Sequence, residues 1–400
     1  MPIPSPFHER TSPLCTSYRW KDWAGYCAVS SYDTSHEREY FAFREAAGLL
    51  DVTPLYKYEV TGKDAAALLG RMMVRDITKL KVGRVAYTCW CDDGGKVVDD
   101  GTVARLDEHH FRVTAADPTL HWLHALSRGF DVAIEDSSAR LAALALQGPT
   151  SRDILKSVSD ADLDKLKFFG VTKANLKGAG GSIPGWISRT GYTGDLGYEI
   201  WVEREDALHT WDALMAAGHA YGIEPAGLDA LDVSRVEAGY VLLGNDYWSA
   251  KKVVLESRKS TPHELGFGWM VDLNRSFIGR DAIAAEVKRG SIWQLVGLEI
   301  SWEELEALYA SFNLPPSLPV TARRDALPVY AEDGRQIGQA TSHTWSPILK
   351  KYLAIASVHR GFETLGGKLR IEHTVEYERR QVTATVAKLP FYDPERKRKP

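Results

Sequence analysis

The amino-acid sequence predicts an α+β fold that ends in a β-rich part. Segments with helical and with strand-like spacing alternate as far as Ala238, whereas strand-like segments predominate from Leu295 onward. The chain has 400 residues, of which 44% are hydrophobic and 26% are charged. A chain of this length and composition can bury a large core and is expected to form two or three domains.

Helices are predicted where apolar residues recur at intervals of three and four. In chain order they span residues 36–49, 63–73, 118–128, 150–157, 205–217 and 225–238. Strands are predicted where short apolar or alternating segments lie between these helices and beyond them. They span residues 57–61, 85–91, 97–105, 111–115, 142–146, 185–190, 198–202, 295–300, 338–342, 353–358 and 382–386.

The charge and the N-terminal sequence indicate a cytoplasmic enzyme. A formal net charge of -4 provides no long-range attraction to nucleic acid or to a membrane. The N-terminal residues MPIPSPFHERTSP lack the basic and apolar pattern of a secretion signal, and no stretch reaches the ~18 apolar residues of a membrane helix. The basic run at residues 396–399 is predicted to be a solvated tail. We therefore expect neither a nucleic-acid nor a membrane partner.

The cysteines and a histidine pair give no metal site. Four cysteines are too few and too poorly spaced for a disulfide framework, so reduced thiols are expected. Cys89 and Cys91 should share one face of a strand, but no second Cys or His pair lies near them in the sequence. His109 and His110 are predicted to lie in a hairpin turn. The sequence also lacks a phosphate-binding loop, which argues against nucleotide-driven chemistry.

A glycine-rich segment at residues 187–200, ISRTGYTGDLGYEI, is the strongest candidate for a binding loop. Gly191, Gly194 and Gly197 recur every three residues, and glycine allows the backbone to approach a ligand or a neighbouring strand closely. Hydrogen-bonding and aromatic side chains, including Tyr192 and Glu199, lie between and beside them. From composition alone, a hairpin with an elaborate turn is an equal alternative.

A pair of aspartates, Asp99 and Asp100, follows the turn Gly94-Gly95. Side chains alternate along a strand, so only one of the two can point into a given site. Taken alone, the pair is also consistent with acids at a turn or at a strand edge.

The glycine-rich segment resembles, nearly letter for letter, the signature of the aminomethyltransferase family, which comprises the glycine-cleavage T-protein and its relatives and binds tetrahydrofolate. Further similar segments follow in the family's order at residues 51–52, 58–65, 85–87, 94–100, 145–149, 227–232, 235–239, 244–246, 277–280 and 346–347. The resemblance runs from about residue 40 to the C-terminus.

The resemblance implies three domains around a central hole that holds folate. A first, folate-binding domain would comprise residues 1–57 and 142–255. An inserted α+β domain of residues 58–141 would carry the catalytic aspartate. Residues 256–400 would form a connecting segment and a C-terminal β-barrel.

The resemblance also implies roles for individual residues. Glu199 corresponds to the glutamate that binds the pterin, and a carboxylate suits the paired donors of the pterin's amino-pyrimidinone edge. Asp100 corresponds to the catalytic aspartate. The folate-binding set implied by the family positions is Tyr192, Tyr87, Arg235, Trp269 and Leu55, and Arg235 could pair either with a ligand carboxylate or with an internal acid.

The chain departs from the T-protein pattern mainly around the one-carbon donor. Thr53-Pro54-Leu55 stands where the family has Ser-His-Met, and Thr114 replaces an asparagine. Tyr247-Trp248 begins a loop with an inserted basic segment. His343 lies in a segment that replaces the family's Gly-x-Phe-Ser-Pro-Thr-Leu-Gly. The folate half of the family pattern is thus retained, and the donor half is changed.

These departures lead to the hypothesis of a tetrahydrofolate-dependent demethylase. Its donor would be an aromatic methyl ether, or a sulfonium or ammonium compound, and the methyl group would pass to N5 of tetrahydrofolate. An ether would need a proton donor, for which Tyr247 and His343 are the candidates. A cationic donor would need none and could rest on aromatic faces.

Two alternatives remain at this stage. One is aminomethyl transfer in the glycine cleavage system, which requires a lipoyl carrier protein as partner. The other is a folate-binding protein without turnover, and it is weakened because residues 238–246 lack the cysteine of such relatives. The sequence identifies neither the donor nor the oligomeric state.

Overall fold

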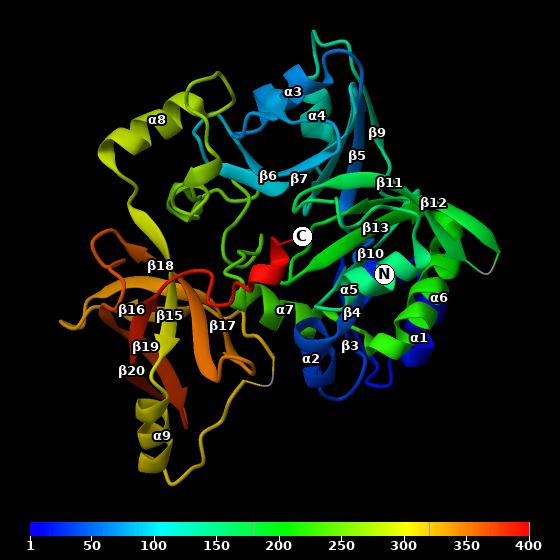
Figure 1. The fold of residues 1–400 in the computed structure, drawn as a ribbon. Coiled ribbons are helices and arrows are strands. Elements are labelled where there is room, and N and C mark those ends of the chain that lie inside the picture. The colour runs from blue at the N-terminus through cyan, green and yellow to red at the C-terminus, as the bar shows by residue number, and fades with distance from the viewer. Residues whose placement is uncertain (179, 320, 400) are drawn as a thin grey trace.

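The computed structural model describes residues 1–178, 180–319 and 321–399 (Figure 1). Within these residues, helices and strands form a small N-terminal sheet, two larger sheets and a closed barrel. The predicted α+β class and the C-terminal β-barrel are confirmed. The exact domain boundaries stay a prediction.

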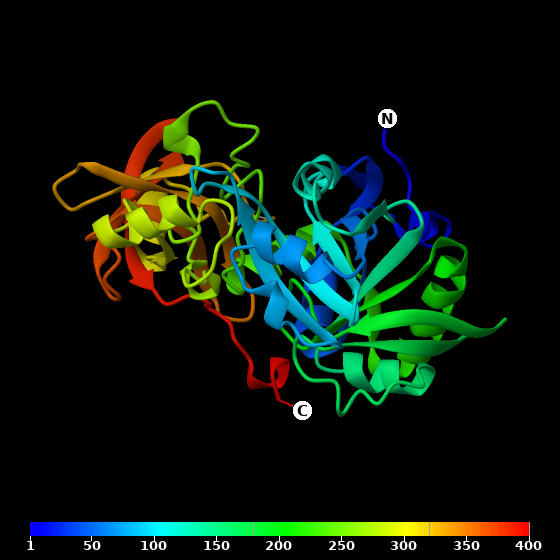
Figure 2. The same ribbon diagram turned by 90° about the horizontal axis from the view of Figure 1, so that it is seen from above.

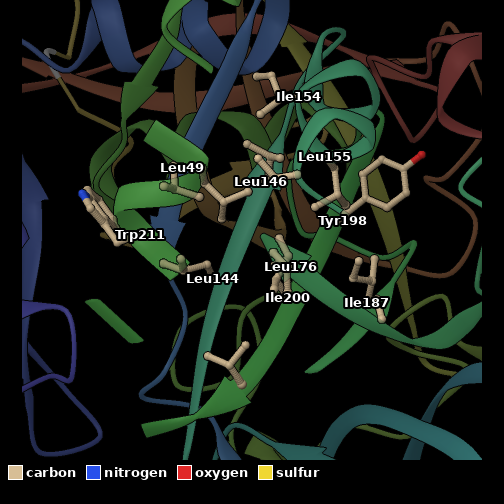
Figure 3. Packing of buried hydrophobic residues seen from close by; sticks show 14 of the residues in the cluster. Leu49, Leu144, Leu146, Ile154, Leu155, Leu176, Ile187, Tyr198, Ile200 and Trp211 are labelled. Atoms are coloured by element: carbon tan, nitrogen blue, oxygen red, sulfur yellow. The ribbon is translucent and has the colours of Figure 1, made fainter. Parts of the chain in front are cut away.

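A six-stranded sheet forms the largest body of the protein, with the strand order β11-β12-β13-β10-β4-β14. Its central strands are almost wholly apolar because both faces are covered. Helices α5 and α6 pack on one face, where Leu146, Ile154 and Ile200 meet in one core (Figure 3). The strands and the two helices are β4 (Ala47–Asp51), β10 (Leu141–Gln147), β11 (Val171–Gly178), β12 (Gly181–Ser188), β13 (Gly197–Glu203), β14 (Ile223–Pro225), α5 (Ser151–Val158) and α6 (Ala207–Gly218).

The other face of this sheet is covered by two further helices. Tyr40 and Phe43 of one helix and Val233 of the other pack against Leu50 and Trp201 of the sheet. A three-stranded sheet at the N-terminus lies beside them. The two helices and the strands of the small sheet are α2 (Glu37–Glu45), α7 (Leu228–Glu237), β1 (Ile3–Pro4), β2 (Arg19–Trp23) and β3 (Tyr26–Ser31). Helix α1 (His8–Leu14) instead contacts α6, where Arg10 forms a salt bridge of 2.7 Å with Asp212.

A five-stranded antiparallel sheet is inserted between β4 and β10, with the strand order β6-β7-β8-β5-β9. Leu68 of α3 and Leu123 of α4 pack on one face. On the opposite face, Val85 and Ala104 contact Val171 of the six-stranded sheet. The elements are β5 (Tyr56–Thr61), α3 (Ala65–Met72), β6 (Arg84–Cys91), β7 (Val97–Asp107), β8 (His110–Ala115), α4 (Leu120–Leu126) and β9 (Ala133–Asp136).

The C-terminal part is a closed six-stranded barrel, which leaves no unpaired sheet edge. Helix α8 precedes the barrel, and α9 lies between its first two strands. Figure 1 shows α7 between the barrel and the rest of the molecule, where it contacts β17. The elements are α8 (Arg280–Arg289), β15 (Trp293–Ile300), α9 (Trp302–Ser311), β16 (Leu327–Tyr330), β17 (Gln336–Ser346), β18 (Lys351–His359), β19 (Lys368–Val375) and β20 (Glu378–Ala387).

Two sequence predictions about local structure were wrong. The helix predicted over residues 36–49 ends at Glu45, and Ala47–Asp51 is a strand. A fully buried strand has no alternation and cannot be distinguished from a buried helix by periodicity. Helices α1, α8 and α9 were not predicted, although Ser301 caps the last of them by accepting a bond from the Glu304 amide at 3.3 Å.

The basic run at residues 396–399 is not simply a solvated tail, as was predicted. Lys397 is 6% exposed, and Arg396 forms a salt bridge of 2.7 Å with buried Asp195. In Figure 2 this C-terminal segment extends from the barrel to the neighbouring body. Tertiary partners from other segments have therefore replaced water around part of the basic run.

In the part of the chain that the structure covers, no helix combines the length and the apolar character needed to cross a membrane.

Candidate active site

The glycine-rich loop, residues 189–196, connects strands β12 and β13. Gln147 fills its interior: the side-chain amide donates to the Thr190 carbonyl at 3.2 Å and accepts from the Thr193 hydroxyl at 3.0 Å. A Cβ at Gly191 would lie 1.9 Å from the Gln147 amide oxygen, so the loop closes around this amide only without a side chain there. The closed loop therefore fixes the positions of Tyr192 and of the first residues of β13.

Glu199 lies on β13, opposite Ser188 of β12 in the antiparallel register. The Thr190 hydroxyl donates to Glu199 Oε2 at 2.8 Å and lies 2.8 Å from the Ser188 hydroxyl. Burial raises the pKa of Glu199, and the hydroxyls of Thr190 and Ser188 partly offset this rise. A carboxylate has about four acceptor positions. Two hydroxyl partners leave it capacity for a ligand.

Glu199 borders a hollow between the six-stranded and the five-stranded sheets. The hollow contains about 310 Å³ of space between atoms, part of it open to solvent. Threonine hydroxyls and aromatic and aliphatic side chains surround the carboxylate, which suits a flat ligand with a polar edge. The lining residues are Val85, Thr102, Ala104, Leu106, Arg112, Thr114, Val171, Ser188, Thr190, Glu199 and Trp201.

Two threonines form the wall of the hollow opposite Glu199. The hydroxyls of Thr102 and Thr114 are 2.6 Å apart, and the Thr102 amide donates to the Thr114 hydroxyl at 3.1 Å. The strands approach each other so closely here that a Cβ on Gly101 would lie 2.0 Å from the Thr114 carbonyl oxygen. Thr114, which departs from the family pattern, therefore forms this wall together with Thr102.

Asp100 lies on β7 between two tyrosines. Tyr87 on β6 donates to Oδ2 at 2.7 Å, and Tyr247, from the loop after α7, donates to Oδ1. Burial raises the pKa of Asp100, whereas the bonds from Tyr247 and Tyr87 lower it. No lysine or arginine among residues 1–178, 180–319 and 321–399 forms an ion pair with this carboxylate. When Asp100 is ionised, its charge is therefore held only by neutral phenols.

The neighbouring Asp99 points to the other side of the sheet. Its Oδ1 accepts from the Asp100 amide at 2.8 Å, and its Oδ2 accepts from the Asp117 amide at 3.0 Å. Burial, followed by the charge of Asp100, raises the pKa of Asp99 well above its usual range. Asp99 thus anchors the β7 backbone and the segment before α4.

The hollow and Asp100 share one face of the inserted sheet. Thr102 follows Asp100 by two residues on β7, and Val85 precedes Tyr87 by two residues on β6, so each pair points the same way. Two residues correspond to about 7 Å along a strand. A ligand edge bound at Glu199 and a reacting atom at Asp100 are thus compatible with one extended site.

Tyr192 and Arg235 complete the border of this region. Tyr192 donates to the Val241 carbonyl, and its ring stacks on Tyr240 with 5.4 Å between centroids. Arg235 is 1% exposed and forms salt bridges with Asp232 and Asp246 at 2.7 and 2.6 Å. Of the two pairings left open for Arg235, the structure shows the one with internal acids.

Three further candidates form no hydrogen bond with Asp100 among the residues that the structure describes. His343 accepts from or donates to the Tyr352 hydroxyl at 2.7 Å within the barrel, and burial lowers its pKa to about 4. Trp269 is 66% exposed beneath the guanidinium of Arg75. Leu55 packs against the apolar cluster between the six-stranded sheet and helices α2 and α7. Among the residues the structure describes, none of the three forms a hydrogen bond with Asp100 or Glu199.

Sequence reasoning did not identify Ser188, Thr190, Arg112 and Trp201 as lining residues of the hollow. The hairpin register pairs Ser188 with Glu199, so alternation along β12 and β13 would have placed Ser188, Thr190 and Trp201 on the side of Glu199. Arg112 comes from another sheet, and no local pattern in the sequence indicates that contact.

The fold is that of a glycine-cleavage aminomethyltransferase. The crystal structure of glycine cleavage system aminomethyltransferase T from Bartonella henselae superposes with a TM-score of 0.82. The match covers 98% of this chain and 99% of that chain. Sequence identity is 23%, so this likeness concerns the fold alone.

The chain belongs to the glycine-cleavage T-protein, or aminomethyltransferase, family, and it is an enzyme of that family. The family model of the GCVT N-terminal domain matches residues 8–275, and that of the glycine cleavage T-protein C-terminal barrel domain matches residues 312–393. The aminomethyltransferase of Bacillus subtilis (strain 168) is 33% identical over 366 residues, covering 90% of this chain and 91% of the relative.

A relative with a different name shows the same identity. The trimethylamine-oxide aldolase of Ruegeria pomeroyi is 33% identical over 405 residues. The match covers 98% of this chain but 47% of that protein, which is therefore about twice as long. Relatives of equal identity thus carry the names of different reactions.

Proposed function

We propose that this enzyme transfers a one-carbon unit to tetrahydrofolate, with the pterin bound in the hollow at Glu199. The lining of the hollow suits the polar edge and the ring of a pterin, because it combines a carboxylate that has remaining acceptor capacity with threonine, aliphatic and aromatic side chains. Glu199 would accept the paired donors of the pterin edge. Trp201 and the threonine wall would hold the ring flat.

Within this function, we propose a demethylase that acts on a cationic donor, a sulfonium or quaternary ammonium compound. The observation that carries the proposal is the uncompensated carboxylate of Asp100, whose partners are two phenols. N5 of tetrahydrofolate supplies the electron pair for the new carbon–nitrogen bond, and the pair of the broken bond stays on the leaving sulfide or amine. Positive charge then moves from the donor to N5, and Asp100 can stabilise it on both sides of the transfer. Loss of the N5 proton to solvent then gives 5-methyltetrahydrofolate.

A methyl ether is less well supported as donor. Its alkoxide would need a proton, but the Tyr247 hydroxyl donates to Asp100 and His343 is bonded to Tyr352 inside the barrel. Burial also holds the pKa of Tyr247 well above its usual range, which keeps the phenol protonated. A cationic donor becomes a neutral sulfide or amine when its methyl group is transferred, so its departure needs no acid.

The test is incubation of the purified enzyme with tetrahydrofolate and a panel of sulfonium, ammonium and aryl ether donors. We expect 5-methyltetrahydrofolate from a cationic donor, detected by mass spectrometry. Asp100→Asn should abolish this product while folate still binds, because Asn preserves the shape but not the charge. Undiminished turnover by Asp100→Asn would show that Asp100 is not the catalytic group.

Aminomethyl transfer from a lipoyl carrier protein is the second candidate, and the names of several relatives favour it. It predicts 5,10-methylenetetrahydrofolate, formed only when an aminomethylated carrier is supplied. The same incubation distinguishes the two functions by the mass of the folate product. The carrier-dependent product without any methyl product would exclude the demethylase.

A further inference from the structure

The C-terminal strap, residues 391–399, leaves the barrel and lies along the glycine-rich loop (Figure 2). Two anchors hold it there. The guanidinium of Arg189, at the start of the loop, donates to the carbonyls of Arg396 and Lys397 at 3.3 and 3.2 Å. Asp195, within the loop, accepts two bonds of 2.7 Å from Arg396.

Both anchors are buried and charged, which makes the attachment specific. Arg189 is 2% exposed, and its guanidinium is bonded to backbone carbonyls. Asp195 also accepts from the Tyr392 hydroxyl at 3.1 Å and lies 3.8 Å from Arg44. Removal of the strap would take away the carbonyl partners that Arg396 and Lys397 provide to this cation and leave the Leu166 carbonyl, and hydrogen-bond partners of a buried charge are costly to lose. The strap is therefore part of the loop's structure.

Lys397 connects this strap to the candidate site. It is 6% exposed, and its ammonium donates to the Tyr240 hydroxyl at 2.7 Å and lies 5.1 Å from the centre of the Tyr240 ring. Tyr240 in turn stacks on Tyr192, with 29° between the ring planes. Tyr192 belongs to the glycine-rich loop and lies two residues from Thr190, which lines the hollow. A line of contacts thus runs from Lys397 to the loop that borders the hollow.

We propose that Lys397 is a positioning residue for the folate site. It fixes Tyr240, and Tyr240 fixes the ring of Tyr192 beside the glycine-rich loop. This inference rests on the proposed folate function. A stacked ring binds a flat ligand well only if its orientation is set beforehand, because ordering it on binding costs affinity. The strap supplies that order before the ligand arrives.

The test uses the full chain with Lys397→Met, which retains the aliphatic stem and removes the ammonium. Tetrahydrofolate affinity is measured by quenching of protein fluorescence. We expect about tenfold weaker binding, and Lys397→Arg should restore most of it. Arg398→Met is the matched control. Arg398 is the next residue, is exposed and forms a salt bridge with Asp393, and among the described residues it makes no hydrogen bond with Tyr240, so folate affinity should not change. Tyr240→Phe breaks the same bond from its other end and should weaken binding similarly.

A second readout does not require folate. Hydrogen exchange of residues 189–197 in the free protein should be faster in Lys397→Met than in Arg398→Met. Normal folate affinity in both Lys397→Met and Tyr240→Phe would overturn the positioning role alone. Failure of the unaltered protein to bind folate would overturn the proposed function and, with it, this inference. If Lys397→Met does not fold, Tyr240→Phe alone decides.

Discussion

Tyr247→Phe is the sharpest test of how Asp100 is held. Tyr247 is 2% exposed, and its hydroxyl donates to Asp100 Oδ1. The substitution removes one oxygen atom and leaves Tyr87 as the remaining phenol donor, at 2.7 Å from Oδ2. A hydrogen bond to a charged group contributes about 1.5–3 kcal/mol. At about 1.4 kcal/mol per tenfold, kcat/KM should fall by about 10- to 150-fold if the ionised carboxylate acts in the reaction.

The pH dependence of kcat/KM tests the direction in which the substitution moves the pKa of Asp100. The Tyr247 bond lowers the pKa of Asp100, so its loss raises a pKa that burial has already raised. The fraction ionised then falls at a given pH, and the acid limb of kcat/KM should move to higher pH. The assay is the rate of folate product formation, followed by mass spectrometry between about pH 5 and 9. Tyr87→Phe is a second, parallel test. It removes the bond to the other oxygen of Asp100 and should move the acid limb in the same direction. An acid limb that stays in place in both variants would refute the role assigned to Asp100.

Three further predictions concern binding and stability. Glu199→Gln should weaken tetrahydrofolate binding by about tenfold or more, measured by fluorescence titration, because a charge-assisted bond is lost. The pKa of buried Lys57 is lowered from 10.5 to about 8. The unfolded chain therefore binds more protons between these pH values, and the free energy of unfolding should rise by about 3 kcal/mol across this window in the unaltered protein but not in Lys57→Met. Gly194→Ala should lower the melting temperature, since Gly194 has φ of +77° and the added Cβ would lie 2.5 Å from the Cβ of Ala238. Unchanged folate affinity in Glu199→Gln would contradict the first expectation. An unfolding free energy that depends on pH equally in the unaltered protein and in Lys57→Met would contradict the second, and an unchanged melting temperature in Gly194→Ala the third.

The sequence predicted the fold class because alternation and helical spacing are local signals. The prediction failed where burial removes that signal: residues 47–49, the first part of strand β4, are buried and without polar side chains, and were assigned to a helix. The positions of Asp100 and Tyr87 on adjacent strands follow from a hairpin, which local pattern can specify. The contact of Tyr247 with Asp100 joins residues far apart in the chain, and composition alone could not have indicated it.

His343 and Lys397 show that tertiary packing can place a predicted site residue elsewhere and can bury a residue that was predicted to be exposed. His343 lies in an altered family segment, and its sequence position made it a candidate acid, but alternation along β17 sends its ring to Tyr352 while Ser342 meets Arg235. Lys397 lies in a charge run that usually indicates solvent, yet Tyr240 and the Arg189 anchor hold it in the interior. The first outcome depends on the pairing of strands within the barrel, and the second on the packing of the C-terminal segment against residues far from it in the chain.

The two halves of the site differ in how they are built, and this difference bears on how the donor is selected. Glu199 and its hydroxyl partners lie on paired strands and on a loop filled by Gln147, so their geometry is fixed by backbone hydrogen bonds. Tyr247 begins the irregular stretch that ends at the short helical turn of residues 256–258. Sites on strands hold ligands more precisely than sites on loops, whereas loops tolerate changes of sequence. Exchange of residues 247–261 for the shorter loop of an aminomethyltransferase should therefore change which donor is used and leave folate affinity close to its original value.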